Sequence, residues 1–239
     1  MFSIFVLTKG EGMELWMDDR ATEQQYRELL QKISMHRSGE VADQMKLRGI
    51  GYKMNWGVSL TDLRAMAAGV PSSHLLALKL WNKQWRETMI LATLTDDPTQ
   101  VTEEQMDYWT HSFTNSEIAE QASANLWCHT LFAYAKALEW CRGKKHFIRY
   151  TAVHLAGRLA MTDKKSPDEM FEPFLEELTT LAKDPTLTQV ITRTALIMAG
   201  RSEYLRDLIA EWTEALTQAE LEASLSLAVE LKEGLQFVG

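Results

Sequence analysis

The stretch IRYTAVHLAGR at residues 148–158 returns 43 positions later as ITRTALIMAGR at residues 191–201. Both copies carry a Thr-Ala pair after three residues and close on Gly-Arg. This spacing lies within the roughly 40–47-residue period of proteins built from stacked pairs of helices. The repeat therefore predicts such a stack, and a chance likeness between two Ala-rich helices is the alternative.

Helical periodicity begins near Thr22 and continues through the rest of the chain. Thr102 and Gln105 have the spacing of a capping box, and Ser166-Pro167 is a typical helix start. Alternating, strand-like runs are absent. The expected helices lie at residues 20–37, 39–48, 60–68, 72–82, 84–95, 102–112, 115–127, 130–141, 146–160, 167–182, 187–199, 202–215 and 218–232.

The connections between these helices are short, which favours antiparallel neighbours. The predicted fold is all-α, a right-handed HEAT-like helical-repeat solenoid (an α-α superhelix) with a concave face. A single repeat domain is expected at residues 19–239, after a loosely ordered N-terminal extension at residues 1–18. A solenoid normally binds a large ligand on its concave face, but the fold alone names no ligand.

The composition, with 46% hydrophobic and 24% charged residues, is that of a soluble helical protein. The apolar run from Phe2 to Leu7 lacks a basic flank and is too short for a signal peptide. No stretch reaches the roughly 18 apolar residues of a membrane span. Cys128 and Cys141 show no metal-like pairing and are expected to be buried. A cytoplasmic location without a membrane partner is therefore expected.

Charge is unevenly distributed along the chain, which has a net charge of -8. Between Lys136 and Lys165, Lys and Arg exceed Asp and Glu by six. Within this segment, RGKKHFIR forms a basic loop that leads into a helix, where ammonium groups and free backbone N–H groups favour a phosphate. A solvated loop that aids solubility is the alternative, and the acidity of the whole chain argues against a general nucleic-acid coat protein.

Three stretches together resemble the DNA alkylation repair family of HEAT-like repeat DNA glycosylases, typified by AlkC and AlkD. They are EVADQMKLRGIGYKMNWGVSLTDLRAMA, LLALKLWNKQWRETMILATLTDDP and FTNSEIAEQASANLW. The resemblance implies a divergent member that holds duplex DNA, including alkylated DNA, in a basic cleft and excises N-alkylated purines. A carboxylate near the sugar stabilises the oxocarbenium-like transition state of that reaction. No metal or organic cofactor is implied.

The family's helix commonly reads N-W-D-x-x-D-Q, and the matching residues here run from Asn115 to Gln121. The resemblance places Glu120 at the catalytic Asp position and Ser116 at the Trp position four residues earlier. Helical spacing predicts an inward stripe of Ile118, Ala122 and Leu126. It predicts an opposite face formed by Ser116, Glu120 and Trp127, with Glu117 on the flank. Trp81, Trp85, Trp109 and Trp127 are expected mostly to pack between helices.

The family's DNA-contacting Arg corresponds to Arg149, and Tyr150 stands where a second basic residue is common. Met198 corresponds to a later Trp of the family. For Arg149 the alternative is a simple ion pair with a neighbouring Glu, and for Glu120 it is a solvated helix residue. The candidate DNA-binding residues are Arg149, Tyr150, Lys144, Lys145, Arg142, Arg158, Ser116 and Arg193, and the candidate catalytic residue is Glu120.

Replacement of the expected Asp and Trp keeps two further readings open. One is a non-catalytic HEAT-repeat module that binds DNA structure or a protein partner through the same face. The other is a scaffold that binds only proteins. The overall acidity of the chain favours a binding module over a glycosylase.

Overall fold

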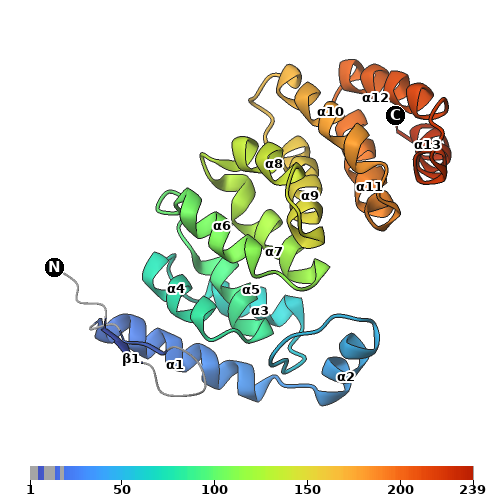
Figure 1. Ribbon diagram of the computed structural model, residues 1–239. Coiled ribbons are helices and arrows are strands. Elements are labelled where there is room, and N and C mark those ends of the chain that lie inside the picture. The colour runs from blue at the N-terminus through green and yellow to red at the C-terminus, as the bar shows by residue number, and fades with distance from the viewer. Residues whose placement is uncertain (1–4, 8–13, 17–18, 239) are drawn as a thin grey trace. The chain divides into compact units, whose positions relative to one another are not determined.

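The computed structural model of this chain describes residues 5–7, 14–16 and 19–238 (Figure 1). These residues contain the α-helices α1 to α13, three short 3-10 helices and one two-stranded sheet. Every helix expected from the sequence has a counterpart, and most ends agree within about two residues, so the all-α prediction is confirmed. None of the described helices is both long enough and apolar enough to cross a membrane.

The described residues form two compact units. The first unit runs up to Met106 and also includes Thr114–Leu126, and the second comprises Asp107–Phe113 and the residues from Trp127 onward. The prediction of a single domain at residues 19–239 stays a prediction.

The first unit opens with a small hairpin in which β1 (Phe5–Leu7) pairs antiparallel with β2 (Glu14–Trp16). The hairpin was not predicted, because each strand is only three residues long. The rest of the extension expected at residues 1–18 lies outside the described residues.

Helices of the first unit pack α1 against α4, α4 against α5, and α5 against both α3 and α7. Their buried faces are apolar, as with Leu29 and Ile33 of α1, which are fully buried. Burial of one such side chain stabilises a fold by about 1.5–3 kcal/mol. The helices are α1 (Arg20–Met35), α2 (Gly39–Leu47), α3 (Leu60–Ala68), α4 (His74–Asn82), α5 (Arg86–Thr95) and α7 (Ser116–Asn125), and α6 (Glu103–His111) contributes residues to both units.

The second unit stacks helices in two rows: α8, α10 and α12 form one, and α9, α11 and α13 form the other. Figure 1 shows these helices from yellow-green to red. The bounds are η1 (Trp127–His129), α8 (Ala133–Cys141), α9 (His146–Thr162), η2 (Asp168–Phe171), α10 (Glu172–Leu181), η3 (Pro185–Leu187), α11 (Thr188–Ala199), α12 (Glu203–Leu216) and α13 (Glu222–Leu235). The segment expected as one helix at 167–182 is thus divided between η2 and α10.

The repeated sequence maps onto two neighbouring helices of one row, α9 and α11. A Cβ atom added to Gly157 would lie 2.8 Å from Oγ1 of Thr194, so the helices approach closely there. The same Oγ1 donates a hydrogen bond to the carbonyl oxygen of Val153 at 2.9 Å. Part of the repeat is therefore explained by packing between these helices.

Candidate nucleic-acid interface

Helix α7 carries the candidate catalytic residue, and its start is fixed by Asn115. The Asn115 Oδ1 accepts a hydrogen bond from the Ile118 backbone N–H at 3.2 Å, which is a typical N-cap. Its Nδ2 donates to the carbonyl oxygen of Gly51 at 2.9 Å and ties α7 to the segment after α2. The predicted inward stripe is confirmed, because Ile118, Ala122 and Leu126 are at most 1% exposed.

Glu117, on the flank of α7, is turned toward other elements of the first unit, and its side chain is only 13% exposed. Its carboxylate receives two hydrogen bonds from Arg86, from Nη2 at 2.7 Å and from Nε at 2.8 Å. The hydroxyl of Tyr52 donates a third, at 2.7 Å. Because Arg86 belongs to α5 and Tyr52 to the segment after α2, Glu117 joins three parts of the first unit.

The Arg86 side chain is only 4% exposed and also donates from Nη1 to the carbonyl oxygen of Val58 at 2.7 Å. Burial lowers the pKa of Arg86, but the hydrogen bonds and charge of Glu117 outweigh it and raise the pKa above its ordinary value. Burial and the Glu117 charge likewise raise the pKa of Tyr52. Arg86 Nη1 also donates to Oε1 of the fully buried Glu87 at 3.2 Å, so Arg86 is a buried cation whose charge Glu117 and Glu87 balance.

Glu120 and Ser116 are half-buried positions on α7. Trp127 does not share their face, contrary to the prediction. It is fully buried in η1, with its ring centroid 5.5 Å from that of Trp109, because α7 ends at Asn125 and the chain then changes direction. Its burial matches the expectation that it packs between helices.

The basic loop of the sequence joins α8 to α9 in the second unit. Arg142 caps the end of α8 and donates from Nε to Glu177 Oε1 at 2.8 Å, while its side chain stays 76% exposed. Lys144 is exposed, and Lys145 precedes α9 and donates from Nζ to the carbonyl oxygen of His111 at 3.2 Å. Three exposed cationic side chains thus lie within four residues of the start of α9.

Arg149 lies one turn into α9 and forms an ion pair with Asp184, with 3.0 Å between Nη2 and Oδ2. The pKa of Asp184 is lowered, mainly by hydrogen bonds from Thr186 and further by the charge of Arg149. The Nε atom of Arg149 is buried and has no hydrogen-bond partner among the described residues. Arg149 therefore keeps a donor that the protein does not use.

A pocket of about 450 Å³ opens beside these residues. Arg142 and Arg149 line it together with Lys183, an exposed residue after α10, and Asp184. Three cationic side chains against one carboxylate give its lining an excess of positive charge. An anionic group such as a phosphate is the ligand that this lining favours.

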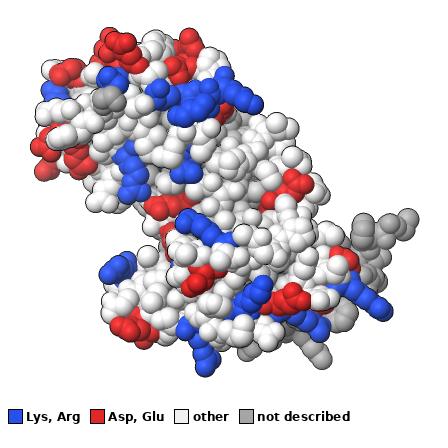
Figure 2. Space-filling model, turned by 180° about the vertical axis from the view of Figure 1, so that it is seen from behind, with Lys and Arg blue, Asp and Glu red and all other residues white. Residues whose placement is uncertain are grey.

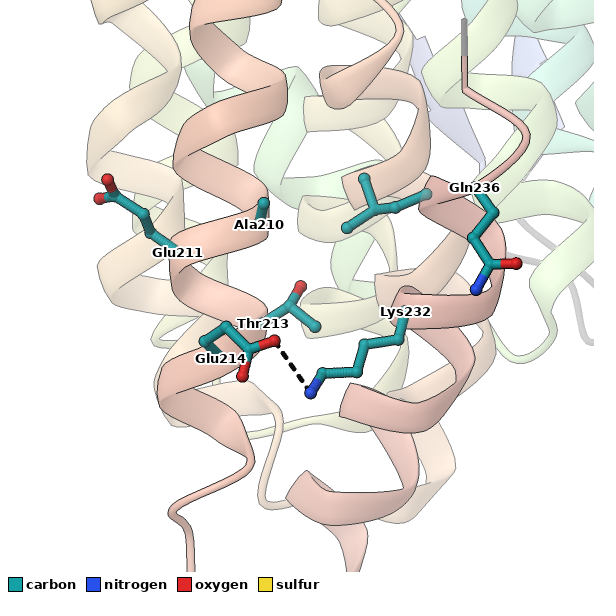
Figure 3. A pocket seen from close by; sticks show the side chains of 7 residues that line it. Ala210, Glu211, Thr213, Glu214, Lys232 and Gln236 are labelled. Atoms are coloured by element: carbon teal, nitrogen blue, oxygen red, sulfur yellow. Dashed lines mark ion pairs between the residues drawn. The ribbon is translucent and has the colours of Figure 1, made fainter.

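A second pocket, between α12 and α13, has a different character (Figure 3). It measures about 470 Å³, and its lining includes Glu211, Glu214 and Lys232. Lys232 Nζ lies 2.9 Å from Glu214 Oε1, so its one cation is paired with a carboxylate. This pocket does not favour an anion.

The surface of α9 combines aromatic and basic side chains and contains no Asp or Glu. From His146 to Ala160, every residue that is not buried is an aromatic residue, a His or an Arg. These residues are His146, Phe147, Arg149, Tyr150, His154 and Arg158. In the face drawn in Figure 2, the largest continuous Lys and Arg area lies in the second unit.

The candidates from sequence are divided between the units. Ser116 and Glu120 belong to the first unit, and the other seven belong to the second. Arg193 lies exposed on α11, whereas Met198 of the same helix is fully buried and presents no side chain to a ligand. The sequence reasoning missed His146, Phe147, His154 and Lys183. The four-residue spacing of His146, Tyr150 and His154 is the signal that could have revealed the first and third of these.

In the described part of the chain, no group of three His, Cys, Asp or Glu residues is placed so that it could hold a metal ion. Cys128 and Cys141 are both buried and neither forms a disulfide, and burial raises the pKa of each thiol. The prediction that they are small buried residues is confirmed.

No protein-family model matches this chain, and a comparison with curated proteins gives no match. Among solved structures, the chain is similar to a member of "a new family of proteins related to the HEAT-like repeat DNA glycosylases with affinity for branched DNA structures". The TM-score is 0.68 at 14% identity, and the match covers 87% of this chain and 94% of that chain. This likeness confirms the predicted HEAT-like repeat fold, the fold of proteins related to the HEAT-like repeat DNA glycosylases.

Proposed function

We propose that this protein binds DNA through the surface of its second unit around α9. The observation that carries the proposal is a 17-residue helix without a carboxylate, on which Arg149 lies between aromatic side chains and Arg158 lies one turn beyond His154. Arg142, Lys144 and Lys145 come directly before it, where the positive end of the helix dipole also favours phosphate. Phosphate contacts of this kind supply most of the affinity of a DNA-binding protein.

Branched DNA is the form that we propose as the preferred ligand. The similar solved structure belongs to a family described as having affinity for branched DNA. The net charge of -8 also disfavours a protein that coats any duplex, because its acidic remainder repels the phosphate backbone. A localised basic surface on an acidic chain suits a ligand that presents several phosphates at one place.

Excision of N-alkylated purines, with Glu120 as the acid and alkylated duplex DNA as the substrate, is a second candidate function. The position of Glu120 favours excision, because Glu120 matches the catalytic Asp of the N-W-D-x-x-D-Q motif and is not fully buried. The replaced aromatic positions count against it: Ser116 has no ring and Met198 is buried. Non-catalytic recognition of DNA structure in the cytoplasm is therefore the function we favour over excision, and over recognition of a protein partner.

An electrophoretic mobility assay with a three-way DNA junction and a linear duplex of equal length tests the proposal. We expect the native chain to bind both at low salt and the junction more tightly. A variant with Lys144→Gln, Lys145→Gln and Arg149→Gln should bind both weakly, whereas Lys232→Gln should bind like the native chain. No binding by the native chain at low salt would refute DNA binding.

Release of methylated purine from alkylated duplex DNA tests the second candidate. If the chain is a glycosylase, it should release the base, and Glu120→Gln should release far less. Equal release by both proteins would remove Glu120 from the mechanism. No release by either would leave DNA-structure binding as the better account.

A further inference from the structure

The rings along α9 form a continuous ladder on one side of the helix. The ring centroids of His146 and Tyr150 are 6.1 Å apart, and those of Tyr150 and His154 are 6.5 Å apart with an angle of only 8° between their planes. Phe147 adds a fourth ring, 4.9 Å from His146 and 6.4 Å from Tyr150. All four side chains are half-buried. We call these residues the α9 ladder.

The internal repeat shows that the fold does not require the ladder. Residues 43 positions after a ladder residue occupy the equivalent place on α11, which packs in the same row. The positions that pack are repeated, since Thr151 and Thr194 are both buried. The ladder positions are not: the equivalents of His146, Tyr150 and His154 are Gln189, Arg193 and Ile197.

Charge around the ladder favours an anionic ligand. Arg149 and Arg158 lie on the same helix, which carries no Asp or Glu, and Arg149 pairs with Asp184. Thr186, two residues beyond Asp184, contacts the Nδ1 atom of His146 at 3.1 Å. A cationic border around partly exposed aromatic rings is the combination by which proteins hold unstacked nucleobases and their phosphates.

We infer that the α9 ladder stacks against unpaired nucleobases of a branched DNA ligand, with Tyr150 as its central ring and Arg149 and Arg158 on the adjacent phosphates. The inference rests on the proposed DNA binding and specifies unpaired nucleobases as the part of the DNA that this surface contacts. Bases in a continuous duplex are stacked on each other and offer no free face to Tyr150. Bases at a branch point or gap do offer one.

Three fluorescent probes separate this inference from DNA binding itself: a fully paired three-way junction, the same junction with two unpaired thymidines at its branch, and a linear duplex of equal length. Fluorescence anisotropy measures the affinity of the native chain for each. The ladder should make the junction with unpaired thymidines the tightest ligand. Loss of one base–aromatic stack should weaken binding by roughly 5- to 150-fold.

Tyr150→Leu should therefore bind the junction with unpaired thymidines at least about fivefold more weakly, and the linear duplex less than about twofold more weakly. Tyr150→Phe keeps the ring and should retain the affinity. His154→Leu should act in the same direction as Tyr150→Leu. Tyr204→Leu is the matched control, because Tyr204 is 45% exposed on α12 of the same unit and outside the ladder.

Two results would overturn the inference while leaving the proposed function in place: equal affinity of the native chain for both junctions, or an equal loss for all three probes in Tyr150→Leu. Failure of the native chain to bind any probe would instead refute DNA binding, and the inference with it. Thermal unfolding followed by circular dichroism shows whether each variant is folded, and if Tyr150→Leu is not, His154→Leu gives the same test.

Discussion

Replacing Glu117 with Gln should destabilise the first unit more than any surface ion-pair change in this chain. Gln keeps the size of the side chain but removes the charge of one of the two carboxylates that pair with Arg86, whose side chain is 4% exposed; the other is that of the buried Glu87. Gln also turns one acceptor oxygen into an NH₂ donor that faces the guanidinium. Because the buried Glu87 still compensates the charge of Arg86, the cost is that of Arg86 donors left without an acceptor, about 1–3 kcal/mol.

For a chain of this length, that cost corresponds to a fall in Tm of roughly 2–12 °C. Thermal unfolding followed by circular dichroism at 222 nm measures it. Glu214→Gln is the control, since Glu214 and Lys232 also pair at 2.9 Å but are 68% and 45% exposed. Exposed pairs contribute about 0–1 kcal/mol. A fall in Tm no greater for Glu117→Gln than for Glu214→Gln would refute the role we give to this buried network.

Three further predictions concern other parts of the molecule. Asp184→Asn keeps the cap of η3 but frees Arg149 from its carboxylate, so duplex affinity at low salt should rise by roughly twofold to tenfold; unchanged affinity in the anisotropy assay would contradict the proposed interface. His74 pairs with Asp96 at 2.7 Å, and this hydrogen bond raises the pKa of His74. The pair therefore stabilises the fold fully below the ordinary His pKa of 6.5, and this stabilisation is lost as the pH rises through the raised pKa. The difference in urea midpoint between the native chain and His74→Asn should be larger at pH 5.5 than at pH 9. A difference that stays constant with pH would count against the ion pair. Gly157→Ala places a Cβ atom 2.8 Å from Thr194 Oγ1 and should lower the free energy of unfolding by about 1–3 kcal/mol in a urea titration. Gly200→Ala, where the nearest contact would be 3.5 Å, should lower it less. The reverse order would refute the close approach of α9 and α11.

The helices were predictable from sequence because the signals that set them are local. Caps such as Asn115 and Ser202 accept hydrogen bonds from the residue three positions on, and each precedes a helix that the periodicity predicted. The inward stripe of α7 follows from helical spacing alone. The hairpin of residues 5–7 and 14–16 was missed, since three-residue strands leave no pattern.

The errors about the site arose where a side chain depends on distant residues. Helical spacing places Glu117 on the flank of its helix but cannot reveal its partner Arg86, which lies 31 positions away on another helix. Helical spacing puts Trp127 on the face of Glu120 only if the helix runs to residue 127, whereas α7 ends two residues earlier, at Asn125. The α9 ladder depends on which residues the packing leaves exposed, and that becomes visible only in the folded chain.

The salt dependence of DNA affinity tests the central claim most directly. Each phosphate contact contributes about 0.9 to the slope of log affinity against log salt for duplex DNA. The native chain should show a steep slope with both the three-way junction and the duplex. In the variant with Lys144→Gln, Lys145→Gln and Arg149→Gln, the magnitude of the slope for the duplex should fall by roughly 2 to 3. In Lys232→Gln the slope should not change. A slope near zero for the native chain, or equal slopes for the native chain and the triple variant, would contradict DNA binding through this surface.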